Sequence, residues 1–93
     1  MRKIVFEARA FQDFIEWANL DKKLYQRIVD LIKDTFRQPF LGIGKPEPLK
    51  GDLKGYWSRR MNDKHRLIYK VTDEAIIIIA CRYHYQGGKK YEV

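Results

Sequence analysis

The fold is decided by residues 75–81, which read Ala-Ile-Ile-Ile-Ile-Ala-Cys. An unbroken apolar run of this length, rich in isoleucine, is typical of a strand that is buried on both faces. A strand of that kind lies inside a sheet, so other segments must supply strands on either side of it. The run is far shorter than the roughly 20 apolar residues that cross a membrane as a helix.

Neighbouring strands are predicted on the N-terminal side of this run. Residues Tyr56–Met61 and His65–Val71 alternate between polar and apolar side chains, and each is followed by a short polar turn. Short turns join antiparallel strands, so these two segments and the isoleucine run form a meander. Residues Lys3–Phe6 predict one more short strand at the start of the chain.

A first helix is predicted from about Ala8. Its apolar stripe consists of Phe11, Phe14, Ile15 and Ala18, which follow helical spacing. The pattern breaks at residues 19–21, so the helix ends there and a turn begins.

A second helix is predicted from Lys22 to Arg37. Asp21 is its expected N-cap, because a short acceptor side chain satisfies free amides in the first turn. Pro39 restricts the backbone of Gln38 and ends the helix. The predicted buried stripe is Leu24, Ile28, Leu31, Ile32 and Thr35. The resulting fold class is α+β, of order β-α-α-β-β-β, with two antiparallel helices packed on a mostly antiparallel four-stranded sheet.

Composition limits the range of functions. The chain has 93 residues, enough for one domain, and a net charge of +7. Most of the excess positive charge lies after residue 44, in a part of the chain with eleven basic and six acidic residues. Such a surface attracts nucleic acid, an anionic membrane or an acidic protein, although plain solubility also explains it. The N-terminus lacks the apolar region of a signal peptide, no membrane span is predicted, and Cys81 suits a buried thiol, so we expect a cytoplasmic protein.

The segment between the second helix and the first meander strand is a candidate functional loop. Residues 39–55 contain three prolines and four glycines, and a loop this long in a small domain is usually functional. Glu47 lies within it between Pro46 and Pro48, which restrict the backbone and hold its carboxylate. On local sequence alone, a solvated loop glutamate is the simpler interpretation.

The other candidates are basic and imidazole side chains. Arg59, Arg60 and Arg66 lie on the two meander strands, where a solvated sheet face is the alternative interpretation. His84 follows the isoleucine run, and His65 at a turn is interpreted as structural. The sequence has no phosphate-binding glycine loop, hydrolase elbow or metal-ligand spacing, so no metal or cofactor is expected. A carboxylate, histidines and arginines suit metal-free RNA cleavage, in which the substrate's 2′-hydroxyl is the nucleophile.

Four stretches carry a specific resemblance. They are Lys-Asp-Thr-x-Arg-x-Pro-Phe-x-Gly-x-Gly-Lys-Pro-Glu-Pro-Leu-Lys (33–50), Tyr-Trp-Ser-Arg-Arg (56–60), His-Arg-Leu-Ile-Tyr (65–69) and Ala-Cys-Arg-Tyr-His-Tyr (80–85). Together they resemble the YoeB (Txe) toxins of the RelE/ParE superfamily of type II toxin–antitoxin systems. The resemblance covers residues 3–85. It implies a RelE-like fold and a ribosome-dependent mRNA endoribonuclease that inhibits translation.

The resemblance also implies roles for individual residues. It makes Glu47 the general base, His84 the general acid, Arg66 the group that stabilises the transition state, and Tyr85 a positioning residue beside the acid. It matches Lys50 and Arg60 to phosphate-contacting positions, and the RNA- and phosphate-binding residues that we expect also include Lys45 and Arg59. Two alternatives remain at this point: a ParE-like toxin that is not a nuclease, and a basic RNA-binding module. The presence of a base, an acid and a cation favours the nuclease.

The resemblance further implies partners and domain limits. A YefM-like antitoxin is expected to bind the toxin, and the ribosome, with mRNA in its decoding site, is expected to present the substrate. A homodimer is also compatible with the sequence. We expect residues 1–85 to form the single toxin domain and residues 86–93 to form a flexible basic tail. Family members commonly stop near the His-Tyr pair, so Tyr85 departs from the family pattern in not being terminal.

Overall fold

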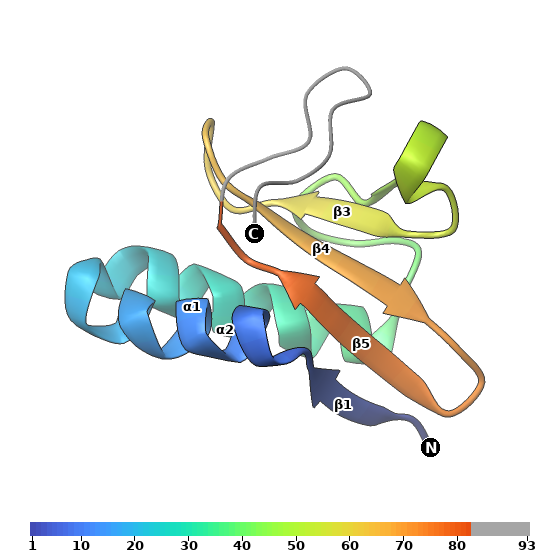
Figure 1. The fold of residues 1–93 in the computed structure, drawn as a ribbon, viewed down its shortest axis with the longest axis horizontal. Helices are drawn as coiled ribbons and strands as arrows, with labels where there is room; N and C mark the ends of the chain where they lie inside the picture. Colours follow the sequence, from blue (N-terminus) through green and yellow to red (C-terminus); the bar gives the residue numbers. More distant parts are fainter. Residues whose placement is uncertain (83–93) are drawn as a thin grey trace.

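The computed structural model describes residues 1–82, which form a sheet with two helices packed against it (Figure 1). The elements are β1 (Lys3–Phe6), α1 (Ala8–Leu20), α2 (Lys22–Arg37), β2 (Glu47–Pro48), the 3₁₀ turn η1 (Gly51–Leu53), β3 (Trp57–Arg60), β4 (Arg66–Val71) and β5 (Ala75–Ala80). This is the predicted α+β arrangement. Neither helix in the described part is long and apolar enough to cross a membrane.

The isoleucine run forms an interior strand, as its composition predicts. The strand order is β1-β5-β4-β3-β2, so β5 has a neighbour on each side. It pairs antiparallel with β4 and parallel with β1, where Lys3 lies opposite Ala75 and Phe6 lies opposite Ile78. The first and last strands of the described chain are therefore neighbours, with β1 at the edge of the sheet and joined to β5 by backbone hydrogen bonds.

The sheet has five strands, and the prediction of four was wrong in this respect. The additional strand is β2, in which Glu47 pairs with Ser58 and Pro48 with Trp57. It is a two-residue edge strand, which suits Pro48 because proline lacks the amide that a central strand would need. A pairing this short leaves no alternation for a sequence pattern to detect.

Helix α2 begins and packs as predicted. The Asp21 carboxylate accepts hydrogen bonds from the amides of Lys23 and Leu24, both at 3.1 Å. Thr35 is fully buried and donates its hydroxyl hydrogen to the Leu31 carbonyl at 2.7 Å. The buried positions are Ile28, Leu31, Ile32, Asp34 and Thr35, and Leu24 is partly buried.

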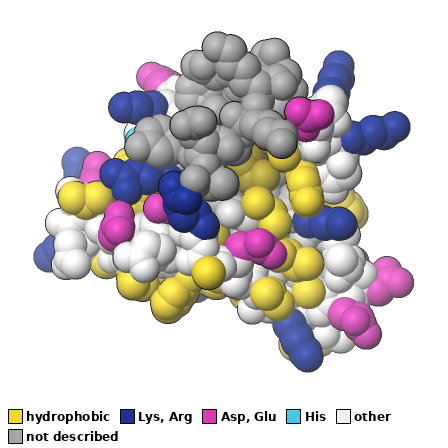
Figure 2. All heavy atoms as spheres, in the orientation of Figure 1, with side chains coloured by type: hydrophobic (Ala, Val, Ile, Leu, Met, Phe, Trp, Pro, Cys, Tyr) yellow, Lys and Arg dark blue, Asp and Glu magenta, His cyan; other side chains and the backbone are white. Residues whose placement is uncertain are grey.

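Helix α1 matches the predicted stripe only in part: Phe14 packs against the core and Ala18 is half-buried. Phe11 and Ile15 remain 51% and 43% exposed, and hydrophobic side chains are visible over α1 on the face in Figure 2. The buried residues are instead Ala10, Asp13 and Trp17. The reason is tertiary, because the Trp17 indole N–H donates to the carbonyl of Cys81 at 2.8 Å and ties α1 to the end of β5. A buried aspartate at the centre of this face hid it from the apolar pattern.

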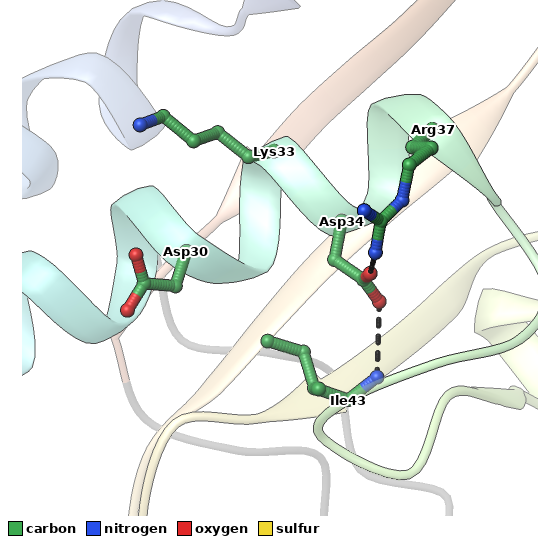
Figure 3. Close-up of a pocket in the computed structure, with 5 residues that line it drawn as sticks. All are labelled: Asp30, Lys33, Asp34, Arg37 and Ile43. Atoms are coloured by element: carbon green, nitrogen blue, oxygen red, sulfur yellow. Dashed lines mark hydrogen bonds and ion pairs between the residues drawn. The ribbon is translucent and has the colours of Figure 1, made fainter.

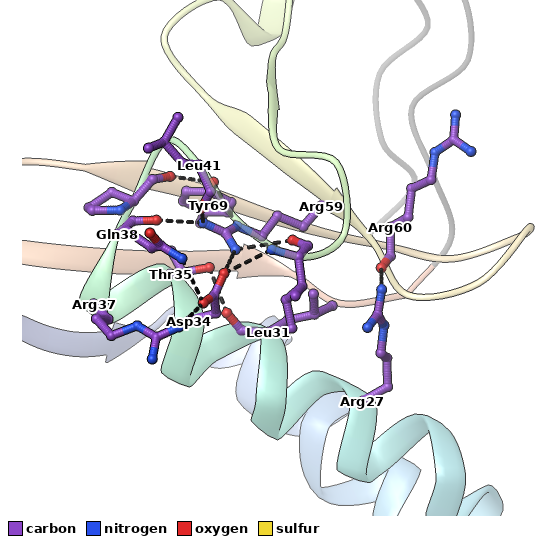
Figure 4. Close-up of polar contacts among 12 residues, drawn as sticks. Arg27, Leu31, Asp34, Thr35, Arg37, Gln38, Leu41, Arg59, Arg60 and Tyr69 are labelled. Atoms are coloured by element: carbon purple, nitrogen blue, oxygen red, sulfur yellow. Dashed lines mark hydrogen bonds and ion pairs between the residues drawn. The ribbon is translucent and has the colours of Figure 1, made fainter.

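A buried ion pair joins α2 to β3. The Arg59 side chain is fully buried, and its Nη1 lies 2.6 Å from Oδ2 of Asp34, which is itself only 6% exposed (Figure 4). Its Nε–H donates to the Tyr69 hydroxyl at 3.2 Å, and that hydroxyl donates to the Pro39 carbonyl at 2.7 Å. Buried charges need such partners, because burying an unpaired charge costs several kcal/mol of folding free energy. We call Arg59, Asp34 and Tyr69 the Arg59 cluster.

Asp34 is surrounded by donors. Its carboxylate accepts from the side chains of Arg37 (2.6 Å) and Gln38 (3.0 Å) and from the amide of Ile43 (2.9 Å), as well as from Arg59. Burial alone would raise the pKa of Asp34, but Arg59 and these hydrogen bonds outweigh it, and the pKa lies well below its usual range. The Asp34 carboxylate is therefore charged at neutral pH.

Replacing this carboxylate should be costly. Asp34→Asn leaves Arg59 charged and buried without its counter-ion, so we expect a loss of about 3–5 kcal/mol in the free energy of unfolding at neutral pH. Because the folded pKa of Asp34 is lowered, its stabilisation is present above the unfolded pKa of about 4 and is lost as the pH falls below that value. The difference in the free energy of unfolding between wild type and variant should therefore become smaller as the pH is lowered. Urea unfolding at neutral and acidic pH measures this difference.

Asp30→Asn is the matched control, because Asp30 is an exposed aspartate on the same helix, bonded to Gln26. It should change stability little at either pH. A deficit for Asp34→Asn that stays constant from neutral to acidic pH would contradict this account of the ion pair.

Candidate active site

Glu47 and Arg66 meet on the face of the sheet that points away from the helices. Residues directly opposite one another in an antiparallel pair share a face, and residues two apart on a strand share it too. Glu47 pairs with Ser58, and Arg60 pairs with Arg66 across β3 and β4. One carboxylate and two guanidiniums therefore come from three strands to a single surface.

The carboxylate and one guanidinium of this surface lie at salt-bridge distance. Oε1 of Glu47 is 4.0 Å from Nη1 of Arg66, with side-chain exposures of 60% and 21% respectively. Glu47 is open to solvent, whereas most of the Arg66 side chain is buried. An exposed base beside an enclosed cation is an arrangement in which a phosphate could bind the cation while the base reaches a neighbouring hydroxyl.

Arg66 has an unused donor. Within residues 1–82, its Nε is the buried side-chain nitrogen that lacks a hydrogen-bond partner. An unsatisfied buried donor costs about 1–3 kcal/mol, so its presence calls for an explanation. A planar guanidinium binds phosphate oxygens through its N–H fork, and an anion at this position would satisfy Nε.

Three of the four predicted phosphate ligands are exposed, one on β3 and two on the segment that carries Glu47. Arg60 is exposed opposite Arg66, and its amide donates to the Gly44 carbonyl at 2.7 Å. Lys45 and Lys50 are exposed on the segment that carries Glu47. Four cationic side chains thus accompany one carboxylate, which gives the surface the positive charge that an RNA backbone requires.

The phosphate-binding role predicted for Arg59 was wrong. Arg59 lies between Ser58 and Arg60 on β3, so strand alternation directs its side chain to the helix side of the sheet. There it is fully buried, and its guanidinium is occupied by Asp34, Tyr69 and loop carbonyls. It has no route to an external phosphate.

His84, Tyr85 and the tail 86–93 lie outside the described residues. The structure does show how the chain is held just before them. Arg82 forms an ion pair with Glu16 at 3.0 Å and approaches Asp13 at 4.0 Å, and its guanidinium lies 5.5 Å from the centre of the Trp17 ring. Helix α1 therefore anchors the chain two residues before His84.

Two other chemically reactive side chains are structural. His65 is buried, with its ring 4.9 Å from that of Trp17 in an edge-to-face arrangement, which fits its predicted structural role. Burial raises the pKa of the Cys81 thiol to about 12, so it stays protonated and unreactive. Residues 1–82 contain no group of three or more His, Cys, Asp or Glu side chains that could hold a metal ion.

A pocket on the α2 side contains none of the predicted site residues. It is lined by Asp30, Lys33, Asp34, Arg37 and Ile43 (Figure 3). The Asp34 carboxylate in its wall is already engaged by Arg37 and by the Ile43 amide, as the dashed lines show. The pocket is thus the outer side of the Arg59 cluster. The pairing of Arg59 with Asp34, 25 residues apart in sequence, had no local signal by which it could have been predicted.

Comparison with known proteins shows the family of this chain. Residues 6–85 match the model of the YoeB-like toxin of bacterial type II toxin–antitoxin systems. The chain belongs to this family. The match includes Glu47, Arg60 and Arg66, which the sheet brings to one surface, and it extends through His84 and Tyr85.

Individual relatives agree along nearly their whole length. The toxin YoeB of Streptomyces coelicolor is 54% identical over 83 residues, which are 89% of this chain and 99% of that protein. A YoeB/ParE toxin from Agrobacterium tumefaciens superposes with a TM-score of 0.86 at 42% identity, covering 91% of this chain and all of that one. In a YoeB–YefM complex from Staphylococcus aureus, the matching chain gives a TM-score of 0.82 at 44% identity, with coverage of 91% and 99%.

Proposed function

We propose that this YoeB-like toxin is a ribosome-dependent mRNA endoribonuclease that needs no metal ion. The observation that carries the proposal is the 4.0 Å approach of the Glu47 carboxylate to Arg66 on an exposed sheet surface lined by cations. Membership of the toxin family supports it, because the matched residues 6–85 include Glu47, Arg66 and His84.

The proposed reaction uses the substrate's own nucleophile. Glu47 takes the proton of a ribose 2′-hydroxyl, and the 2′-oxygen attacks the adjacent phosphorus. The bond to the 5′-oxygen breaks, and that oxygen takes a proton from His84, leaving a 2′,3′-cyclic phosphate and a 5′-hydroxyl. Arg66 stabilises the negative charge that develops on the phosphorane oxygens. Lys45, Lys50 and Arg60 hold the flanking phosphates.

The ribosome is proposed to supply what the exposed site lacks. Glu47 is 60% exposed, so water competes for the carboxylate and a flexible message has little to align it for in-line attack. A ribosome that holds the message and covers this surface would provide positioning, which contributes up to about 7–11 kcal/mol in favourable cases.

Glu47→Gln tests the base directly. The amide keeps the size and loop position of the side chain but cannot accept the 2′-hydroxyl proton, so cleavage should fall about 10²–10⁴-fold. The measurement is primer extension on a message bound to ribosomes and translated, with naked message in parallel. Glu74→Gln, an exposed glutamate at the β4–β5 turn, is the matched control and should cleave normally. Equal cleavage of naked and ribosome-bound message would contradict the role of the ribosome.

A sulfur-substituted message separates the acid from the base. Sulfur in place of the 5′-oxygen leaves without protonation, so this substrate should restore cleavage by His84→Ala while Glu47→Gln stays slow. Rescue of Glu47→Gln instead, or of neither variant, would remove His84 from the role of acid.

We also propose that an acidic, YefM-like antitoxin segment binds over the site. The support is the concentration of basic residues after residue 44 and the exposure of Arg60 and Lys45 beside Glu47. The YoeB of Staphylococcus aureus that superposes on this chain is in a complex with YefM. Complementary charge speeds encounter more than it strengthens the final complex.

Salt should therefore act on association. Raising the salt concentration should slow binding of the cognate antitoxin far more than it speeds dissociation, measured by surface plasmon resonance. Arg60→Gln should reduce both the association rate and its salt dependence, whereas Lys22→Gln, at the exposed start of α2, should not. An association rate that does not respond to salt would contradict the electrostatic part of this proposal.

A further inference from the structure

We propose that the Arg59 cluster positions Glu47 for catalysis, which makes Arg59 and Tyr69 positioning residues of the reaction. The inference rests on the proposed function, since it assumes that Glu47 is the base. It goes beyond that function because it assigns a role in activity to side chains that never reach the substrate surface.

The guanidinium of Arg59 donates hydrogen bonds to several carbonyls of the loop that precedes Glu47. Its Nη2 donates to the carbonyls of Gln38 and Leu41, both at 2.7 Å, and its Nη1 donates to the carbonyl of Ile43 at 3.1 Å (Figure 4). Through Tyr69 the cluster also holds the Pro39 carbonyl. Four carbonyls within residues 38–43 thus converge on one buried cation and its hydroxyl neighbour.

The backbone of this loop needs to be held. Gly42 and Gly44 have φ angles of 115° and 81°, and a Cβ added at Gly42 would lie 2.0 Å from the Asp34 carboxylate. Lys45 has a φ of 51°, a left-handed conformation that costs a residue with a side chain about 1 kcal/mol or more. Such a conformation persists only where the surroundings impose it, and here it occurs two residues before Glu47.

The pairing of Glu47 itself is too short to supply this order. Strand β2 has two residues, and one of them, Pro48, has no amide to donate. Two consecutive residues of β3 hold the loop instead. The Arg60 amide donates to the Gly44 carbonyl, and the Arg59 side chain donates to the carbonyls of residues 38, 41 and 43. The strand that carries the cluster on its inner side therefore carries the partners of Glu47 and Arg66 on its outer side.

Tyr69→Phe is the test variant. It removes one buried hydroxyl, and with it the bonds to Arg59 Nε and to the Pro39 carbonyl, while the Arg59–Asp34 ion pair remains. On ribosome-bound message, we expect kcat to fall roughly tenfold to a hundredfold because the base is misplaced, and KM to stay within about twofold because the phosphate ligands are untouched. Arg59→Met is a more severe variant that also removes the ion pair.

General destabilisation is separated from positioning by a control and a double variant. Asp21→Ala removes the N-cap of α2 and lowers the unfolding midpoint without touching the loop. It should leave kcat unchanged at a temperature where it is as folded as Tyr69→Phe. Added to Glu47→Gln, Tyr69→Phe should cause no further loss of cleavage, because its effect is exerted through the base. A full additional loss in the double variant would overturn the proposal.

A measurement that does not need activity distinguishes the failure of this inference from failure of the proposed function. Nitrogen-15 relaxation should show that Tyr69→Phe increases the mobility of the Gly44 and Glu47 amides, whereas Asp21→Ala does not. A wild-type chain that never cleaves message would contradict the proposed function. If the Glu47 amide is equally rigid in the wild type and in Tyr69→Phe, the positioning role is overturned, whether or not the chain cleaves the message.

Discussion

The buried ion pair between Arg59 and Asp34 is the interaction on which the rest of this structure depends. A guanidinium with no exposed surface must have a counter-ion and acceptors for its N–H groups, or the folded state would bear a penalty of several kcal/mol. Asp34 supplies the charge and the loop after α2 supplies the carbonyls. The requirement to satisfy one buried cation therefore gives a proline- and glycine-rich loop a single conformation, although that loop buries little apolar surface of its own.

Strand alternation connects this interior requirement to the exposed surface. Ser58 and Arg60 point away from the helices while Arg59, between them, points inward. A side chain that anchors the loop and side chains that face Glu47 and Arg66 are thus consecutive residues on one rigid strand. Any displacement of β3 would move both together, which keeps the carboxylate and the cations in register with each other.

Sequence patterns predicted the parts of the fold that depend on local chemistry. The isoleucine run 75–81 indicated an interior strand, and Asp21 indicated the start of α2, because both signals are complete within a few neighbouring residues. The buried face of α1 was predicted only in part, because the orientation of this helix depends on the Trp17 bond to Cys81, 64 residues away. Strand β2 was missed because its two residues acquire strand geometry only from β3.

The candidate site was also predicted only in part. Family resemblance selected Glu47, Arg60 and Arg66, and the sheet brings these three together. Arg59 was selected as one of the basic residues on the meander strands. Its burial follows from the side of β3 that faces the helices, and two adjacent arginines do not show which of them lies on that side. Its partner Asp34 looks in sequence like any other helix aspartate. A single sequence does not show which charged residues far apart in the chain will pair.

Native-state hydrogen exchange of the wild-type chain tests the central claim most directly. The amides of Ile43 and Arg60 donate to the Asp34 carboxylate and to the Gly44 carbonyl, so their exchange reports opening of the loop. If the Arg59 cluster makes this loop part of the core, both amides should exchange with the same free energy as the slowest amides of β4 and β5, which is that of global unfolding. Exchange of the loop amides through a local opening of much lower free energy, while the sheet stays protected, would contradict the account.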